Sequence, residues 1–424
     1  MADKIMMFAI PGFFLLMAIE LVAARLMRRD VYRLNDAINS IGLGVLSQVV
    51  GVFAKFLIVG IYAWVVQRVA LFDLPLDSPW TWISALVLYD FCYYWLHRMG
   101  HEVNVLWAAH VVHHQSERYN LSTALRQTGS GVLLGWIFYM PMALLGYPVE
   151  VFAVVAVIDL LYQYWIHTEL VGKLGWFDRV FASPSNHRAH HAVNDRYLDR
   201  NYGGIFILWD RMFGTFVEED ERDPPVYGTR APLRSWNPLW ANAEVYWATA
   251  KDAWHARRWR DKLKVWFMHP GWRPADVAER FPKPDFDQQR EDYDPVVSPW
   301  MKAYCFLQFV LALGMGVYFL QTAAVATLWA ALAQAVFLLA TLMLTGALLE
   351  GRRWPLWPEL ARLALLGLWP LLAGRWLDGN AVAPPVQAGL AAVAAISGAL
   401  LLLAAWKSRS ASSMGKDPLP SVSP

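Results

Sequence analysis

Residues 97–127 of the chain read HRMGHEVNVLWAAHVVHHQSERYNLSTALRQ, and residues 186–216 read NHRAHHAVNDRYLDRNYGGIFILWDRMFGTF. These two stretches contain eight of the eleven histidines, and a ninth, His167, lies between them. The eight fall into three groupings, called boxes here: His97 and His101; His110, His113 and His114; His187, His190 and His191. Side chains three or four residues apart lie on one face of a helix. Each box therefore predicts imidazoles aimed at one common point, a half-site for a metal.

The number of histidines predicts more than one metal ion. Imidazole is a ligand for zinc, copper, iron and nickel, and eight clustered imidazoles exceed the four ligands of one tetrahedral zinc site. Two metal ions are therefore expected. We include His167 as a ninth ligand, with a hydrogen-bonded core histidine as the alternative for this isolated residue.

Composition places these histidines in a membrane protein. The 424 residues are 57% hydrophobic and 17% charged, with a mean hydropathy of +0.29, which is far more apolar than a soluble domain. The expected fold is an all-α integral membrane bundle of about nine spans, the first retained as a span and not cleaved as a signal peptide. The expected spans are about 5–24, 41–67, 80–96, 131–146, 148–166, 301–321, 324–349, 360–377 and 384–406.

The chain is expected to divide into three parts. Residues 1–300 form a catalytic region that contains the boxes, between 97 and 191, and a cap of short helices over 167–300. Many of the 23 tryptophans lie in this cap, a composition that suits the level of the lipid headgroups. Residues 301–406 form a C-terminal transmembrane region, and the polar tail 407–424, rich in Ser and Pro, is expected to be disordered.

Arginine-rich loops predict the orientation of the chain. The loop 25–33, the segment 167–300, the loop with Arg352 and Arg353, and the start of the tail are basic. With nine spans, all of them and all nine clustered histidines fall on the cytoplasmic side, as the positive-inside rule requires. The abundance of Ala, Leu, Arg and Trp favours a bacterial inner membrane, with the endoplasmic reticulum as the eukaryotic equivalent.

Three acidic residues near the histidines are candidate catalytic residues. Asp90 lies two helical turns before His97, and Asp159 precedes His167 by eight residues with Gln163 midway. A carboxylate inside a span requires a partner, so both are expected to accept an imidazole N–H, with an inter-helix hydrogen-bond network as the alternative. Glu102 is either a metal ligand or the partner of Arg98 in an i,i+4 ion pair.

The two histidine-rich stretches resemble the fatty acid hydroxylase and sterol desaturase superfamily, which are integral-membrane, non-haem di-iron oxygenases. The opening H-R-x-x-H-E, followed by W-A-A-H-x-V-H-H and Y-N-L-S-T-A-L-R-Q, is most similar to the alkylglycerol monooxygenase branch. The three boxes match those of the superfamily, and Glu102 matches an acidic residue that accompanies the first box in this branch. One departure is Gln115, which follows the second box where serine is usual.

The resemblance implies an enzyme with two iron ions that uses O2 to hydroxylate a lipid C–H bond. The expected target is the carbon next to the ether oxygen of an alkylglycerol, which releases a fatty aldehyde and glycerol. The alternative is a hydroxylase or desaturase of a fatty acyl, sterol or carotenoid-like lipid, and a remote alternative is a metal transporter.

An external electron donor is required, because the sequence has no dinucleotide-binding loop, haem motif or iron–sulfur motif. The branch implies a tetrahydropterin, whereas the hydroxylases and desaturases imply an electron-transfer protein. No basic stripe with interleaved aromatics indicates nucleic acid. Six polar residues near the boxes could orient ligands or substrate, or serve only as caps and turns: Asn120, Arg126, Asn194, Asp199, Asn201 and Tyr202.

Overall fold

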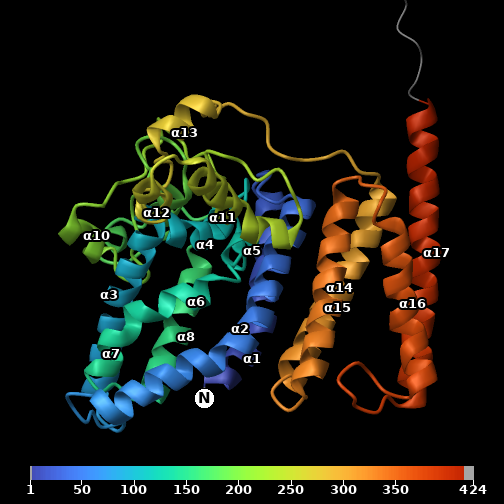
Figure 1. Cartoon of the computed structure of the whole chain (residues 1–424), viewed down its shortest axis with the longest axis horizontal. Helices are drawn as coiled ribbons and strands as arrows, with labels where there is room; N and C mark the ends of the chain where they lie inside the picture. Colours follow the sequence, from blue (N-terminus) through green and yellow to red (C-terminus); the bar gives the residue numbers. More distant parts are fainter. Residues whose placement is uncertain (1, 415–424) are drawn as a thin grey trace, which may run out of the picture. The chain divides into compact units, whose positions relative to one another are not determined.

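The computed structural model describes residues 2–414, apart from the side chains of 2–8, 55–57 and 408–414. Within these residues the regular elements are all helices, joined by loops, and there is no strand, only three isolated β-bridges. Figure 1 shows long helices and a group of short ones. The predicted all-α fold is confirmed.

The chain folds as two compact units. Unit 1 consists of Met1–Arg234 and Leu239–Asp292, and unit 2 consists of Ser235–Pro238 and Tyr293–Pro424. All nine clustered histidines belong to unit 1.

Unit 1 begins with helices that alternate between long and very short. In chain order they are α1 (Ala2–Leu26), α2 (Leu34–Val69), α3 (Pro79–Glu102), α4 (Asn104–His114), α5 (Leu121–Ala124), α6 (Gly131–Gly135), η1 (Trp136–Tyr139), α7 (Met140–Leu144) and α8 (Val149–Trp165). Helix α3 packs against α4 and α8, and α1 also packs against α8. An aromatic core joins these helices, with the rings of Tyr89 and Tyr139 stacked at 4.6 Å and those of Tyr62 and Phe152 at 4.4 Å.

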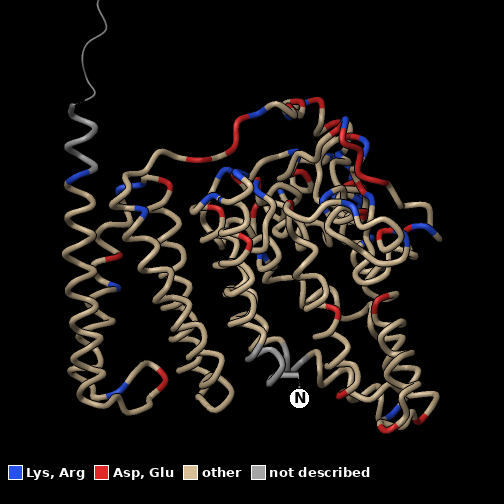
Figure 2. Tube along the Cα trace, turned by 180° about the vertical axis from the view of Figure 1, so that it is seen from behind, with Lys and Arg blue, Asp and Glu red and all other residues tan. Residues whose placement is uncertain are grey.

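Short helices follow α8 and form the cap of unit 1. They are η2 (Phe177–Arg179), α9 (Pro184–His191), α10 (Leu208–Phe213), α11 (Pro238–His255), α12 (Trp259–Phe267) and α13 (Ala275–Arg280). Figure 2 shows that charged residues of unit 1 concentrate in this part of the chain, while the long helices are mostly free of charge. The segment expected to form a cap thus contains short helices, and its place at a face of the membrane stays a prediction.

Local sequence explains why two short helices form at the boxes. Ser183 caps α9, since its Oγ accepts from the Asn186 N–H at 3.4 Å, and Pro184 at the first turn has no N–H to satisfy. Helix α3 ends and α4 begins at Val103, whose backbone is extended. The Asn104 N–H at the start of α4 donates to the Met268 carbonyl at 2.9 Å, so residues next to α12 fix where α4 starts.

Six helical segments of the described chain are long and apolar enough to cross a membrane. Two lie in unit 1, Ala9–Leu26 and Leu34–Ala54. Four lie in unit 2: Pro299–Thr322, Leu328–Leu349, Leu356–Ala373 and Pro384–Lys407. These segments identify the chain as an integral membrane protein.

The predicted count of about nine spans is not confirmed. The run 131–146 is divided among α6, η1 and α7, and α8 has only 17 residues. Helix α3 is long enough at 24 residues, but Asp90, His97 and His101 reduce its apolar character, and it is not among the six segments. The count of nine includes runs of apolar residues without regard to breaks or to buried polar side chains, and it stays a prediction.

Unit 2 is a bundle of four helices, α14 (Pro299–Thr322), α15 (Leu328–Leu349), α16 (Leu356–Ala373) and α17 (Pro384–Met414). A buried ion pair lies in this bundle, with Arg362 donating to Glu359 at 2.6 and 2.8 Å and to Gln308 at 2.6 Å. Helix α17 continues to Met414, so part of the tail predicted to be disordered is helical, and residues 415–424 lie outside the described residues.

Candidate metal centre

Nine histidines from four segments of unit 1 meet in its interior. Helix α3 contributes two, α4 three, the turn after α8 one and α9 three: His97, His101, His110, His113, His114, His167, His187, His190 and His191. Eight are buried, and His110 is partly buried. The structure thus brings together every histidine that the sequence singled out.

The nine imidazoles form two sets. Site A, as we call it, comprises His97, His101, His110, His114 and His190, whose ligand atoms all lie within 4.8 Å of one another. Site B comprises His113, His167, His187 and His191, within the same limit. His167 therefore lies with the box histidines and is not an isolated core residue. Each set could hold one metal ion.

The division between the sites does not follow the boxes, because consecutive residues on a helix point about 100° apart while residues four apart differ by only about 40°. His110 and His114 of α4 therefore share site A, and His113 between them faces site B. In α9, His187 and His191 share site B and His190 faces site A. The expectation that each box forms one half-site is wrong for the second and third boxes.

Backbone carbonyls fix the tautomer of four of the imidazoles. The Nδ1 atoms of His97, His113, His167 and His190 lie 2.7 to 2.9 Å from the carbonyl oxygens of Tyr202, Arg126, Gln163 and Arg200, respectively. A carbonyl oxygen only accepts, so each Nδ1 must carry the proton and donate it. The Nε2 atom of each of these rings is left with a bare lone pair, the form that binds a metal.

These lone pairs converge without a proton between them. In site B the Nε2 atoms of His113 and His167 are 3.1 Å apart, and both rings carry their proton on Nδ1, so neither can donate to the other. In site A the Nε2 atoms of His97, His101 and His190 are buried and have no hydrogen-bond partner among the described residues. Nitrogens bound to one metal at about 2.0 to 2.1 Å lie roughly 3 Å apart. A cation at each site satisfies these otherwise opposed or unpaired atoms.

Burial keeps the imidazoles neutral. It lowers the pKa of His113 to about 4 and holds the pKa values of His97, His114, His187 and His191 well below their usual range. Neighbouring imidazoles lower them further, since two protonated rings at this distance would repel. At neutral pH these rings are therefore deprotonated, as metal ligands must be.

One loop, residues 199–203, contacts three histidines of site A. The Tyr202 carbonyl accepts from His97 at 2.8 Å, the Arg200 carbonyl accepts from His190 at 2.8 Å, and a carboxylate oxygen of Asp199 lies 3.5 Å from Nδ1 of His101. On its other side the Asp199 carboxylate pairs with His269 at 3.1 Å. Three acceptors within four residues thus orient three of the five site A imidazoles.

The loop 199–203 has an unusual backbone that other residues hold in place. Asp199 and Asn201 have positive φ angles of 57° and 58°, which non-glycine residues rarely adopt. The Asn201 side chain donates to the carbonyls of Asn186 and Val217 at 3.0 and 2.8 Å and accepts from the Val217 N–H at 2.8 Å. These three bonds offset the cost of the left-handed conformation.

The buried carboxylate of Asp210 secures the end of the same loop. It accepts from the N–H groups of Tyr202 and Gly203 at 2.8 and 2.7 Å and from the Thr215 hydroxyl at 2.6 Å. Burial raises the pKa of Asp210 to about 6, and these donors counter part of that rise. A side chain at position 203 would place its Cβ 2.5 Å from the Phe206 carbonyl oxygen, so only glycine fits there.

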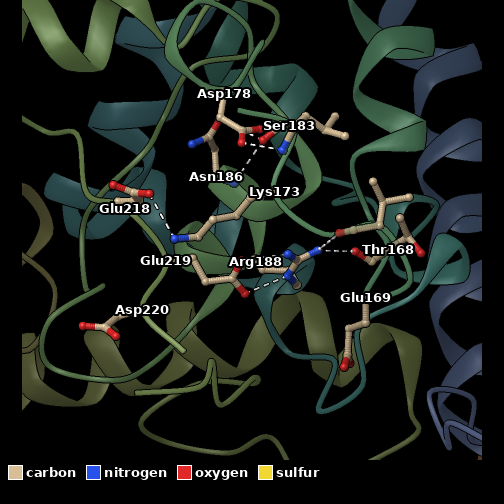
Figure 3. Close-up of polar contacts among 12 residues, drawn as sticks. Thr168, Glu169, Lys173, Asp178, Ser183, Asn186, Arg188, Glu218, Glu219 and Asp220 are labelled. Carbon is tan, nitrogen blue, oxygen red and sulfur yellow. Dashed lines mark hydrogen bonds and ion pairs between the residues drawn. The ribbon is translucent and has the colours of Figure 1, made fainter. Parts of the chain in front are cut away.

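A buried arginine joins the segments that form site B (Figure 3). Arg188, between His187 and His190 in α9, donates through Nε and one terminal nitrogen to both carboxylate oxygens of Glu219, at 2.8 and 2.7 Å. Its other terminal nitrogen donates to the carbonyls of Thr168 and Val171 at 3.0 and 2.7 Å. Arg188 therefore ties α9 to the segment that follows His167.

Glu102 lies in neither histidine set. Its carboxylate pairs with Arg98, with Nε and Oε1 2.9 Å apart. This is the i,i+4 ion pair that was the alternative to a ligand role.

Asp90 and Asp159 are buried, but neither bonds to an imidazole among the described residues. Asp90 accepts from the N–H groups of Ile205 and Phe206 at 2.6 and 3.1 Å and from the Trp209 indole at 2.7 Å. It therefore holds the segment directly after the loop 199–203.

Asp159 is linked to His167 through Gln163. It accepts from the Gln163 side chain at 2.6 Å, and the Gln163 backbone carbonyl accepts from His167. The Tyr93 hydroxyl donates to the same side chain at 2.6 Å, so the polar stripe on α8 belongs to an inter-helix network. Gly204 is necessary beside both carboxylates, because a Cβ there would lie 2.8 Å from an oxygen of Asp159 and of Asp90.

The six other polar candidates divide evenly. Arg126, Asp199 and Tyr202 contact histidines directly, Arg126 and Tyr202 through their carbonyls. Asn120, Asn194 and Asn201 contact no imidazole in the described chain; Asn120 caps α5 and Asn194 bonds to the segment 223–226. The unusual Gln115 is buried between the Ala241 carbonyl and the Arg126 guanidinium.

Sequence reasoning missed Arg188, Glu219, Asp210 and His269. Asp210, Glu219 and His269 lie beyond the third box, outside the helical spacing that marks the histidines. An arginine inside a run of three metal-binding histidines was the one available clue, because its charge beside metal ions requires an anionic partner.

The chain is similar to known proteins in the region that contains the histidines. The family model for fatty acid hydroxylase matches residues 82–215, which include all nine histidines. An alkylglycerol monooxygenase from Homo sapiens is 39% identical over 350 residues, which covers 81% of this chain and 77% of that protein. The alkylglycerol monooxygenase of Danio rerio is 40% identical over 312 residues, 72% of this chain and 68% of its own.

A more distant relative covers only part of the chain. The ornithine lipid hydroxylase OlsE of Rhizobium tropici is 31% identical over 138 residues, 32% of this chain and 41% of its own. No solved structure matches the chain.

Proposed function

Because this chain belongs to the fatty acid hydroxylase family and is similar over most of its length to alkylglycerol monooxygenases, we propose that it is a membrane-bound di-iron oxygenase that acts on ether lipids. The observation that carries the proposal is the pair of histidine sets, each with buried Nε2 atoms converging on one point. Family membership alone supports a lipid hydroxylase, and gives a metal transporter no support.

Nine imidazoles would hold the two irons, five at site A and four at site B. Iron bound at both sites would supply the O2-dependent oxidation that amino-acid side chains cannot perform. The protein's own part is to hold four of the rings through Nδ1, so that their Nε2 lone pairs face the two sites. Burial also keeps bulk water away from the centre.

The proposed reaction hydroxylates the carbon next to the ether oxygen of an alkylglycerol. One atom of O2 enters the C–H bond, and the other leaves as water with two electrons and two protons from a reductant. The product is a hemiacetal, which collapses to a fatty aldehyde and glycerol without further help from the protein.

An external reductant is proposed, since the sequence has no dinucleotide-binding loop, haem motif or iron–sulfur motif. We favour a tetrahydropterin because of the similarity to alkylglycerol monooxygenases. An electron-transfer protein is the alternative reductant.

We place the histidines on the cytoplasmic side of the membrane. What supports this placement is contact between the basic loop 25–33 and the histidine-bearing part of unit 1. The Arg29 guanidinium donates to the Glu169 carbonyl at 2.8 Å, two residues after His167. Basic loops favour the cytoplasmic side, and this argument does not depend on the number of spans. The prediction of a bacterial inner membrane has no support from the animal alkylglycerol monooxygenases.

The cap is proposed to touch the lipid headgroups. On α12 the side chains of Trp259, Leu263 and Phe267 follow one another at four-residue spacing and are 66 to 80% exposed. Arg260 and Lys264 lie next to this stripe and are exposed as well. An exposed apolar stripe with aromatic and basic residues is typical of a helix at the membrane interface.

The proposal is tested by product analysis. Membranes that contain the full chain are incubated with an alkylglycerol under O2, with and without tetrahydropterin, and fatty aldehyde is measured. Aldehyde that depends on both O2 and the pterin is expected, and His113→Ala membranes with equal protein content serve as the inactive control. Aldehyde from the variant contradicts the proposal, whereas aldehyde formed without the pterin assigns the electrons to another donor.

A second lipid class is the competing function, favoured by the similarity of 138 residues of the chain to an ornithine lipid hydroxylase. A parallel incubation with a free fatty acid and with an ornithine lipid separates the two. A hydroxylated lipid without any aldehyde from alkylglycerol would assign the chain to that class.

A further inference from the structure

We propose that two separate structural devices position the two metal sites: the loop 199–203 positions site A, and the Arg188–Glu219 pair positions site B. The inference rests on the proposed function to the extent that both sites bind a metal. It predicts that each site can be weakened while the other keeps its affinity.

The acceptors of the loop 199–203 contact imidazoles of site A. The three acceptors are the Asp199 carboxylate and the carbonyls of Arg200 and Tyr202, and their partners His101, His190 and His97 all belong to site A. An acceptor at Nδ1 fixes both the proton and the rotation of the ring, and so the direction of the Nε2 lone pair. A shift of this loop would therefore misalign three of the five imidazoles of one site at once.

Asn201 is the residue that holds this loop in shape. It is buried, contacts no histidine, and ties the loop to α9 and to Val217 through three hydrogen bonds of 2.8 to 3.0 Å. With a φ of 58°, its backbone is one that glycine adopts without strain. Replacing Asn201 by glycine removes the three bonds and leaves the left-handed backbone acceptable.

The Arg188–Glu219 pair acts on site B. Arg188 lies next to His187 in α9 and donates to the Thr168 carbonyl, next to His167, as well as to Val171. The pair therefore fastens the backbone on which His167 sits to the helix that carries His187 and His191. Both side chains are largely buried, at 8% and 14% exposed, so water cannot replace the fork of bonds to Glu219.

The two supports share no direct bond, although both reach α9, which carries His190 of site A as well as His187 and His191 of site B. None of the hydrogen bonds of Arg188 described above goes to the loop 199–203, and the acceptors of the loop contact no site B histidine. Site B rings are oriented instead by the carbonyls of Arg126 and Gln163, which lie far from that loop in sequence.

The test compares Asn201→Gly with Arg188→Lys in the purified full chain. Lysine keeps the positive charge but cannot make the two-pronged contact to Glu219. Asn194→Gly is the matched control for the first variant, since Asn194 is also buried and makes three hydrogen bonds, none to a histidine. Arg273→Lys is the control for the second, since Arg273 makes an equally forked contact to Asp252 away from the histidines.

The readout is release of bound metal to a chelator of known affinity, followed by metal analysis. Each variant is expected to lower the affinity for one of the two bound ions by about 10- to 100-fold and to leave the affinity for the other unchanged. The site affected is identified in a His167→Ala background, which leaves the site A ion bound. Asn201→Gly should weaken the binding of that remaining ion, whereas Arg188→Lys should leave it unchanged.

Milder variants apply if either protein fails to fold. Asp199→Asn and Glu219→Gln keep the size of the side chain and should weaken the same sites by smaller factors. Equal weakening of both ions by one variant, or the same effect in the control variants, overturns the inference. Failure of the wild-type chain to hold two ions would instead refute the proposed function.

Discussion

His167 provides the sharpest quantitative prediction, because it is the one ligand that lies outside the boxes. Its replacement by alanine leaves three imidazoles in site B, whereas His110→Ala leaves four in site A. Four is the complete ligand set of a tetrahedral site. His167→Ala should therefore weaken metal binding far more than His110→Ala, although His110 belongs to a box and His167 does not.

The size of the effect follows from the number of ligands. Four-ligand protein sites bind zinc with about 10 to 16 kcal/mol, which is about 2.5 to 4 kcal/mol for each ligand on average. Since 1.4 kcal/mol corresponds to a factor of ten, loss of His167 should weaken site B by about 60- to 700-fold. Loss of His110 should lower the metal affinity of site A by less than about tenfold.

Chelator competition on the two purified variants measures both numbers, with gel filtration in detergent to confirm that the proteins are folded. The Nδ1 of His167 donates to the Gln163 carbonyl within its own segment, so the contacts between segments that alanine removes are those to the neighbouring imidazoles and to the Tyr119 ring, stacked at 5.6 Å. A His167→Ala protein that keeps both ions at wild-type affinity would refute the assignment of His167 to site B.

Three other predictions concern stability. Metal-free protein should lose stability as the pH falls from about 6.5 towards 4, because burial lowers the pKa of His113 to about 4 and the unfolded chain therefore takes up the proton first. Melting temperatures that stay constant over this range would contradict this prediction. The pH dependence expected for Asp210 has the opposite sign. Burial raises the pKa of Asp210 to about 6, so the stability that this residue contributes below about pH 4 is lost as the pH rises to 6. The melting temperature of wild type minus that of Asp210→Asn should therefore decrease from pH 4 to pH 6. Glu359→Gln should leave the charge of buried Arg362 unpaired and cost about 3 to 5 kcal/mol, whereas Glu218→Gln at an exposed pair should cost no more than about 1 kcal/mol; equal effects in thermal unfolding would show that the pair in unit 2 is not buried in solution.

The histidine cluster could be predicted from the sequence because its signal is chemical as well as periodic. Nine of eleven histidines within one part of the chain, at helical spacing, already indicate metal ligands. The assignment of His113 and His190 to different sites from their box neighbours follows from the 100° step of a helix. It requires only the knowledge that α4 and α9 face both sites, which depends on packing and not on local sequence.

The acceptors that orient the histidines could not be predicted from residue types. The sequence drew attention to the carboxylates of Asp90 and Asp159, but the rings bond to backbone carbonyls such as those of Arg200 and Tyr202. Every residue has a carbonyl group, so its use depends on the local backbone, here one with positive φ at Asn201. The carboxylates instead hold neighbouring loops and helices.

The number of spans predicted from the sequence exceeds the six candidate segments of the described chain for a related reason. Hydropathy measures composition along a window, and it does not detect a break such as that between α6 and α7. It also cannot tell which side of α3 is buried against α4 and α8. The interior of unit 1 therefore contains apolar helices that are not among the candidate spans.

Iron content is the measurement that tests the central claim most directly. The full chain, purified from cells grown with adequate iron, is analysed for all first-row transition metals and for protein concentration. The two histidine sets predict two iron ions for each chain, reduced to one in His167→Ala. Two results would contradict the di-iron centre and the oxygenase function that depends on it. One is a wild-type protein that holds a single zinc ion, and the other is a His167→Ala protein that holds as much metal as wild type.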